Sequence, residues 1–150
     1  MKHFDRIGVY EFPDKYVIIT IDTLEQGGGI HTDQITSLPK SVDNLELSKW
    51  ILKHLELSKS GIKKNVDREK AKNELIKVTG LKTLKAQMKD SKYVSLNRHN
   101  GIYSIGPTIN GGTSGPKKGY HFKKEKIEFN EPEIISEIGI NIKKGFELSE

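Results

Sequence analysis

The sequence predicts an α+β fold with a mainly antiparallel sheet built from hairpins, two central helices and a C-terminal helix packed on the sheet. Strand-like runs joined by short turns stand at both ends of the chain, two helical patterns follow one another in its middle, and Asn100-Gly101 is a typical hairpin turn. Hairpins and grouped helices indicate α+β architecture. A length of 150 residues predicts one domain, spanning residues 1–150.

The first third of the chain predicts a hairpin followed by a loop. Residues 3–12 partly alternate apolar and polar side chains, Pro13-Asp14 is a turn signal, and residues 16–21 are rich in β-branched residues. Because the second strand is apolar on both faces, we expect it inside the sheet, with helices on at least one side. Residues 30–41 show no period and are predicted to form a loop.

Two helices are predicted in the middle of the chain. The first begins near Leu45 after a cap at Asp43 or Asn44 and ends at Gly61. The second spans residues 67–79, between a cap at Asp67 and a stop at Gly80. Residues 81–88 fit either a short helix or an edge strand.

The last third predicts a second hairpin, a long loop and a final helix. Strands are expected over residues 92–98 and 102–105, a glycine-rich loop over 107–119, and one or two short strands over 120–129. A C-terminal helix capped by Asn130, with Pro132 in its first turn, follows. Its predicted buried stripe is Ile134, Ile135, Ile138, Ile142 and Phe146.

The composition narrows the class of protein. The chain has no cysteine, which excludes disulfides, thiolate zinc sites and cysteine nucleophiles. No export signal and no apolar run of membrane-spanning length is present, so a cytoplasmic location is expected. The net charge of +5 comes from lysine rather than arginine, which favours a solvated surface over nucleic-acid recognition.

No catalytic motif emerges, and neither a cofactor nor a metal is expected. The glycine-rich loop lacks the spacing of a nucleotide P-loop, and Pro116 offers no backbone N–H. His31, His121 and Lys118 are the trio that a metal-free ribonuclease would require, but any histidine- and lysine-rich chain offers such a set. Asp22 and Glu25 are the best carboxylate pair for a metal, and they fit strand-end capping better.

Two loops supply the candidate binding residues, because exposed and chemically varied loops commonly carry recognition. The predicted contact residues are His31 and Asp33 in the first loop, and Lys117, Lys118, Tyr120 and His121 in and after the second.

Residues 74–148, about half of the chain, resemble the immunity proteins of contact-dependent growth inhibition systems, the CdiI type. Three segments carry the resemblance: residues 74–83, ending a helix with Thr79-Gly80-Leu81-Lys82-Thr83; the hairpin strand of residues 100–108; and the Glu133-to-Gly139 segment, which opens a helix. The helix from Leu45 to Ser58 is a looser echo of the family.

The resemblance implies a non-enzymatic inhibitor of a cytosolic toxin. Such a protein would bind the C-terminal toxin domain of its cognate CdiA effector as a 1:1 heterodimer and occlude the active site of that domain, typically a tRNase or other RNase. Because nuclease inhibitors are often acidic, this basic chain implies that its toxin presents an acidic face or is bound away from the RNA groove.

The alternative interpretation is a small basic RNA-binding protein with aromatic side chains along one sheet face. Tyr93 and Tyr103 are the candidate stacking pair, although packing across their own hairpin is the expected arrangement.

Overall fold

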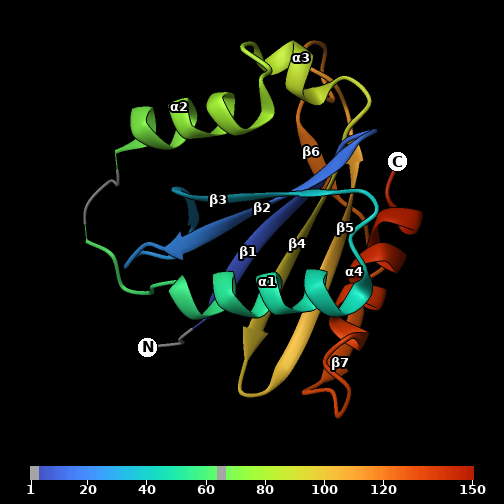
Figure 1. The fold of residues 1–150 in the computed structure, drawn as a ribbon. Helices are drawn as coiled ribbons and strands as arrows, with labels where there is room; N and C mark the ends of the chain where they lie inside the picture. Colours follow the sequence, from blue (N-terminus) through green and yellow to red (C-terminus); the bar gives the residue numbers. More distant parts are fainter. Residues whose placement is uncertain (1–3, 64–66) are drawn as a thin grey trace.

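A computed structural model describes residues 4–63 and 67–150 of the protein (Figure 1). It confirms the predicted α+β fold, with a mainly antiparallel sheet and a C-terminal helix. The strands are β1 (Asp5–Glu11), β2 (Lys15–Thr23), β3 (Gly29–Pro39), β4 (Lys92–His99), β5 (Ile102–Asn110), β6 (Tyr120–Phe122) and β7 (Ile127–Asn130). The helices are α1 (Asn44–Leu57), α2 (Arg68–Thr79), α3 (Leu84–Met88) and α4 (Glu137–Leu148).

All strand pairs of the sheet are antiparallel, in the order β3-β2-β1-β4-β5-β6, and β7 also pairs with β5. The N-terminal and Asn100-Gly101 hairpins are confirmed as β1–β2 and β4–β5. The predicted start of the first strand at His3 lies outside the described residues. β2 lies inside the sheet, as its apolar faces predict, between β1 and β3.

The predicted loop over residues 30–41 is wrong, because most of that segment is β3, which pairs with β2. The register shifts between Ile19 and Ile21 of β2. The strand was missed because its apolar residues are divided between the two faces of the sheet: Leu38 belongs to the main core, and Ile35 packs on the opposite face, so no period-two pattern appears. His31 and Ile35 therefore belong to a strand, not to a loop.

One face of the sheet carries the main core, under α1 and α4 (Figure 1). The ridge of α1 contributes Leu47, Ile51 and Leu55, all fully buried. Asp43 caps α1 by accepting a hydrogen bond from the Glu46 backbone N–H at 2.8 Å, as predicted. The helix ends at Leu57 rather than Gly61. The Asp67 cap and Gly80 stop of α2 are confirmed, and residues 84–88 form a helix.

The C-terminal helix begins later than predicted, at Glu137 instead of after Asn130. Asn130 cannot cap it, because this residue ends β7 and pairs with Ile102. Ile134 and Ile135, predicted to be buried, precede the helix and are 61% and 43% exposed. Ile138, Ile142 and Phe146 form the buried stripe as expected.

The long loop predicted over residues 107–119 is shorter, since β5 continues to Asn110. The remaining loop is held by its own hydrogen bonds. Asn110 donates through its amide nitrogen to the carbonyls of Met88 and Ser91, at 2.6 and 2.8 Å. The backbone N–H groups of Gly111 and Gly119 donate to the carbonyls of Gly119 and Gly112. The loop is thus an ordered extension of the β5–β6 corner.

His54 of α1 lies in the main core between two threonines of the sheet. Its Nδ1 lies 2.8 Å from Thr20 Oγ1, and its Nε2 lies 2.7 Å from Thr36 Oγ1. Thr20 also donates to the His54 carbonyl at 3.2 Å. Both ring nitrogens are satisfied by neutral hydroxyls, and burial lowers the pKa of His54 to about 4.

Acid is therefore expected to destabilise the fold through His54. Since its folded pKa lies below the ordinary value near 6.5, stability is fully present above about pH 6.5 and falls as the pH drops toward 4. We expect a loss of about 3 kcal/mol over this window, measured by urea unfolding at a series of pH values. His54→Gln should flatten this part of the profile, and an unchanged slope would exclude His54 as its source.

Candidate functional site

The second face of the sheet is covered only in part, by α2 and α3, and this leaves a groove. Its small core consists of Phe12, Val17 and Ile19, with Leu75 and Val78 of α2 packed against it. A cavity of about 620 Å³ opens between the strands and the two helices. It is lined by Tyr10, Ile19, Gly29, Ile30, His31, Thr32, Ile35, Arg68, Ala71, Lys72, Leu75, Ile76, Lys82, Leu84 and Gln87.

The groove stays open because α2 is lightly anchored. Only Ala71 and Thr79 of this helix are buried. Its main neighbour is β3, near the edge of the sheet, and Figure 1 shows α2 and α3 together at the top of the molecule, apart from α1 and α4. Lys15 fastens one end by donating to the Thr79 carbonyl at 3.2 Å. Because so few side chains of α2 are buried against the sheet, the space between this helix and the strands is not filled.

The rim of the groove is positively charged. Arg68, Lys72 and Lys82 line the cavity, and none of its lining residues is acidic. Its floor is apolar. Concave apolar surfaces with a few polar groups are the usual form of binding sites. This groove therefore favours a partner segment that combines apolar and acidic side chains.

An aromatic cluster adjoins the floor of the groove. Tyr10 and Tyr93 face each other across β1 and β4 with ring centroids 4.8 Å apart, and Tyr120 of β6 lies 5.3 Å from Tyr93. The ring of His31 lies 6.5 Å from that of Tyr93. The Tyr120 hydroxyl is hydrogen-bonded to Ser91 Oγ at 2.6 Å. The cluster links β3, β1, β4 and β6 across one face.

Gly8 makes room for this cluster. A Cβ atom at Gly8 would lie 2.5 Å from the Tyr93 hydroxyl and 2.7 Å from its ring, so the phenol lies directly over the backbone of β1. Burial raises the pKa values of Tyr10 and Tyr93 above their ordinary value, so both hydroxyls stay protonated and can donate.

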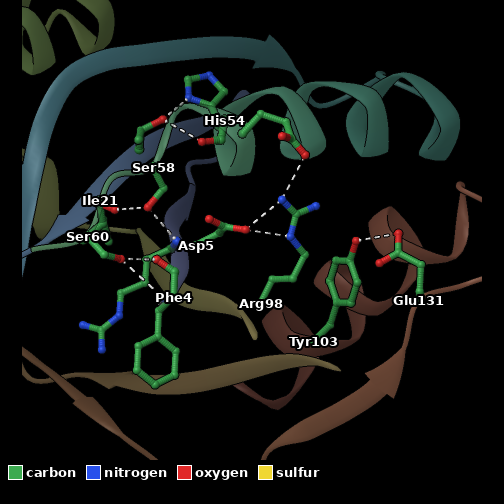
Figure 2. A network of polar contacts seen from close by, with 12 residues as sticks. Phe4, Asp5, Ile21, His54, Ser58, Ser60, Arg98, Tyr103 and Glu131 are labelled. Atoms are coloured by element: carbon green, nitrogen blue, oxygen red, sulfur yellow. Dashed lines mark hydrogen bonds and ion pairs between the residues drawn. The ribbon is translucent and has the colours of Figure 1, made fainter. Parts of the chain in front are cut away.

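A second cavity, of about 420 Å³, lies at the other end of the sheet. Figure 2 shows the network at its wall: Arg98 Nη2 lies 2.8 Å from Asp5 Oδ2 and 2.9 Å from Glu56 Oε1, and Tyr103 donates to Glu131 at 3.0 Å. These contacts join β1, β4, β5, α1 and the segment after β7. The Arg98 guanidinium is paired with the carboxylates of Asp5 and Glu56, so we interpret the network as stabilising the fold.

Serines extend this network along β1 (Figure 2). Ser58 Oγ donates to the Ile21 carbonyl at 2.6 Å and accepts from the Arg6 backbone N–H at 2.9 Å. Ser60 Oγ donates to the Phe4 carbonyl and accepts from the Phe4 N–H. The segment after α1 thereby fixes the start of β1, which carries Arg6 and Gly8 to the aromatic face.

The predicted contact residues lie in two regions of the structure, the groove with its neighbouring elements and the β5–β6 corner. His31 lines the groove, and Tyr120 lies in the adjoining aromatic cluster. Asp33, on β3, forms an ion pair with Lys70 of α2 at 3.1 Å. Lys117, Lys118 and His121 belong to the β5–β6 corner, where His121 Nε2 lies 2.9 Å from the carbonyls of both lysines.

The sequence did not indicate α2 and α3 as part of the site. From the sequence alone, ordinary surface cations are all that can be seen in Arg68, Lys72 and Lys82. Leu75 and Ile76 belong to a narrow apolar stripe that predicts a core-facing helix. The one available signal is the narrowness of that stripe, which predicts a helix covering little surface.

No described interaction unites the three residues of the ribonuclease hypothesis. His31 contacts Tyr93, while His121 and Lys118 interact with each other at the β5–β6 corner. Asp22 accepts from the Lys59 backbone N–H at 2.9 Å, which is the predicted capping role. Within residues 4–63 and 67–150, no group of three His, Asp or Glu side chains is arranged to hold a metal ion.

Tyr93 and Tyr103 lie on opposite faces of the sheet, so the prediction that they pack across their hairpin, or stack as an RNA-binding pair, is wrong. Arg98 pairs with Tyr103 and Leu96 with Ile105, which places Tyr103 on the main-core face. Tyr103 stacks on Phe129 instead, with centroids 5.0 Å apart. Tyr93 and Arg98, the residue opposite Tyr103, are an odd number of positions apart on β4, and such residues point to opposite faces of a sheet.

Comparisons with known proteins identify the fold. No protein-family model matches the chain, and no curated protein sequence matches it significantly. Among solved structures, a protein of unknown function from Neisseria meningitidis is similar with a TM-score of 0.81 and 19% identity, covering 100% of this chain and 98% of the other.

A chain of the CdiA-CT/CdiI toxin and immunity complex from Yersinia pseudotuberculosis is similar with a TM-score of 0.80 and 13% identity. The alignment covers 99% of this chain and 98% of that one. The resemblance stated from the sequence is thus confirmed at the level of the fold. Among the described residues, no helix is long and apolar enough to cross a membrane.

Proposed function

We propose that this protein is an immunity protein that binds and neutralises the C-terminal nuclease toxin domain of a cognate CdiA effector. It acts in the cytoplasm, forms a 1:1 complex and covers the active site of a tRNase or other RNase. The observation that carries the proposal is the basic-rimmed apolar groove, in a fold shared over its full length with a chain of a toxin and immunity complex.

The groove also accounts for the basic composition. A nuclease toxin needs positive charge where RNA binds, which would repel a basic inhibitor at that surface. Arg68, Lys72 and Lys82 instead suit an acidic surface of the toxin beside an apolar segment. Binding through such a segment leaves the rest of the lysine-rich surface solvated.

Growth rescue tests the function directly. The protein is co-expressed with the C-terminal domain encoded immediately upstream of its gene, and host growth and complex formation are measured. Restored growth with a stable complex of one copy each supports the proposal. Continued toxicity with no complex would contradict it.

RNA binding distinguishes the alternative interpretation. We expect at most weak RNA binding that vanishes at physiological salt, because Tyr10, Tyr93 and Tyr120 pack against one another instead of offering free faces. The measurement is fluorescence anisotropy with labelled single-stranded RNA and tRNA over a salt series. Saturable binding at physiological salt would favour the RNA-binding function instead.

A further inference from the structure

The aromatic face holds a group of hydrogen-bond donors that the protein itself does not use. Arg6 of β1 lies on the same face as Tyr10 and Tyr93, since Arg6 pairs with Asn97 and Tyr10 with Tyr93 in one register. Its guanidinium lies against Gly29, where a Cβ atom would be 3.3 Å from Nη1. Gly29 and His31 both line the groove, so Arg6 and Tyr93 adjoin its floor.

Arg6 has no acceptor among the residues that the structure describes. Its Nε is buried without a hydrogen-bond partner, and its Cζ lies 5.3 Å from the centroid of the Phe4 ring. The two carboxylates beside it in the β1–β2 pairing are engaged elsewhere: Asp5 with Arg98, and Asp22 with the Lys59 N–H. A partly buried arginine without a carboxylate is costly, because its desolvation is not compensated.

The Tyr93 hydroxyl is likewise unpartnered within the described chain, although the residue is only 8% exposed. It lies over Gly8, between Arg6 and Tyr10 on the face of β1. Neither the Tyr10 hydroxyl nor the His31 ring has a hydrogen-bond partner among the described residues, whereas the Tyr120 hydroxyl is bound to Ser91. Of these groups only Arg6 Nε is itself buried, and the two hydroxyls and the imidazole reach solvent, so all of them are free to meet an acceptor from outside.

We propose that Arg6, Tyr10, His31 and Tyr93 form a subsite for a carboxylate, and that the toxin supplies it from an aspartate or glutamate side chain. This inference rests on the proposed function. A guanidinium and two phenols are all donors, and a carboxylate accepts from several donors at once. Apolar contacts in the groove and one buried charge pair beside it would then anchor the partner together.

Acetate tests the subsite on the free protein. Sodium acetate is titrated into ¹⁵N-labelled protein against sodium chloride of equal ionic strength, and the Arg6 Nε–Hε resonance is followed. We expect a saturable shift that is absent in Arg6→Gln and reduced in Tyr93→Phe, while Arg68→Gln on the rim retains it. No saturable shift in the wild type, or an unchanged titration in Tyr93→Phe, would overturn the proposal.

The toxin domain gives the second readout. Arg6→Gln and Tyr93→Phe should each weaken its binding by about 10- to 100-fold, as expected for a lost charge-assisted hydrogen bond. Tyr93→Phe keeps the ring packing, and thermal unfolding verifies that both variants are folded. Wild-type affinity in both would overturn the carboxylate subsite and leave the immunity function standing. If the wild-type protein does not bind the toxin domain, the proposed immunity function is contradicted. The acetate titration then tests the carboxylate subsite independently.

Discussion

Reversing the charge of the groove rim, in the triple variant Arg68→Glu, Lys72→Glu, Lys82→Glu, is expected to weaken toxin binding by about 100-fold or more. All three side chains line the cavity and none has an acidic neighbour in its lining. An acidic toxin segment would then meet like charge, which costs several kcal/mol. Calorimetry at two salt concentrations measures the change, and growth of toxin-expressing cells reports the loss of immunity.

A matched control reverses three exposed lysines of the β5–β6 corner and the residues after it: Lys117→Glu, Lys118→Glu, Lys124→Glu. Both triple variants change the net charge equally, so long-range steering is affected alike. We expect the corner variant to keep most of its affinity. If the corner variant loses binding and the rim variant does not, the contact lies at Lys117 and Lys118, as the sequence predicted.

Gly139→Val is expected to destabilise the fold by about 3 kcal/mol. Gly139 lies where α4 crosses α1: a Cβ there would be 2.7 Å from the Asn44 carbonyl and 3.0 Å from Ser48 Oγ. The Gly139 N–H also donates to Ser48 Oγ at 2.8 Å. A larger side chain must separate the helices and break this bond.

Urea unfolding measures this effect, with Lys144→Val as the control, because Lys144 is exposed on the same helix. The control places the same β-branched residue in α4 and should cost well under 1 kcal/mol. Equal losses in the two variants would show that helix propensity, not the α1–α4 approach, governs the result.

The parts of the fold that follow local rules were predicted well from the sequence. Asp43, Asp67 and Gly80 begin and end helices as their cap chemistry requires, and Asn100-Gly101 forms its hairpin. Errors arose where tertiary pairing overrides local signals. β3 is hidden because its apolar residues Ile35 and Leu38 pack on opposite faces of the sheet, and Asn130 has cap chemistry but is held in β7.

The site was predicted only in part, for a similar reason. His31 and Tyr120 were chosen as loop residues, and the structure places them at the groove and its aromatic cluster. Arg6 gave no signal, and Tyr93 was considered only as half of a stacking pair with Tyr103, because the importance of both residues depends on which groups lie opposite. An unpaired guanidinium is visible only once the neighbours of β1 are known.

Hydrogen–deuterium exchange of the protein, free and bound to the upstream-encoded toxin domain, tests the central claim that the groove binds the toxin. Backbone amides of β3, α2 and α3 are predicted to gain protection, since these elements line the cavity and α2 is lightly anchored. Protection confined to the outer surfaces of α1 and α4, with α2 and α3 exchanging as in the free protein, would contradict the claim.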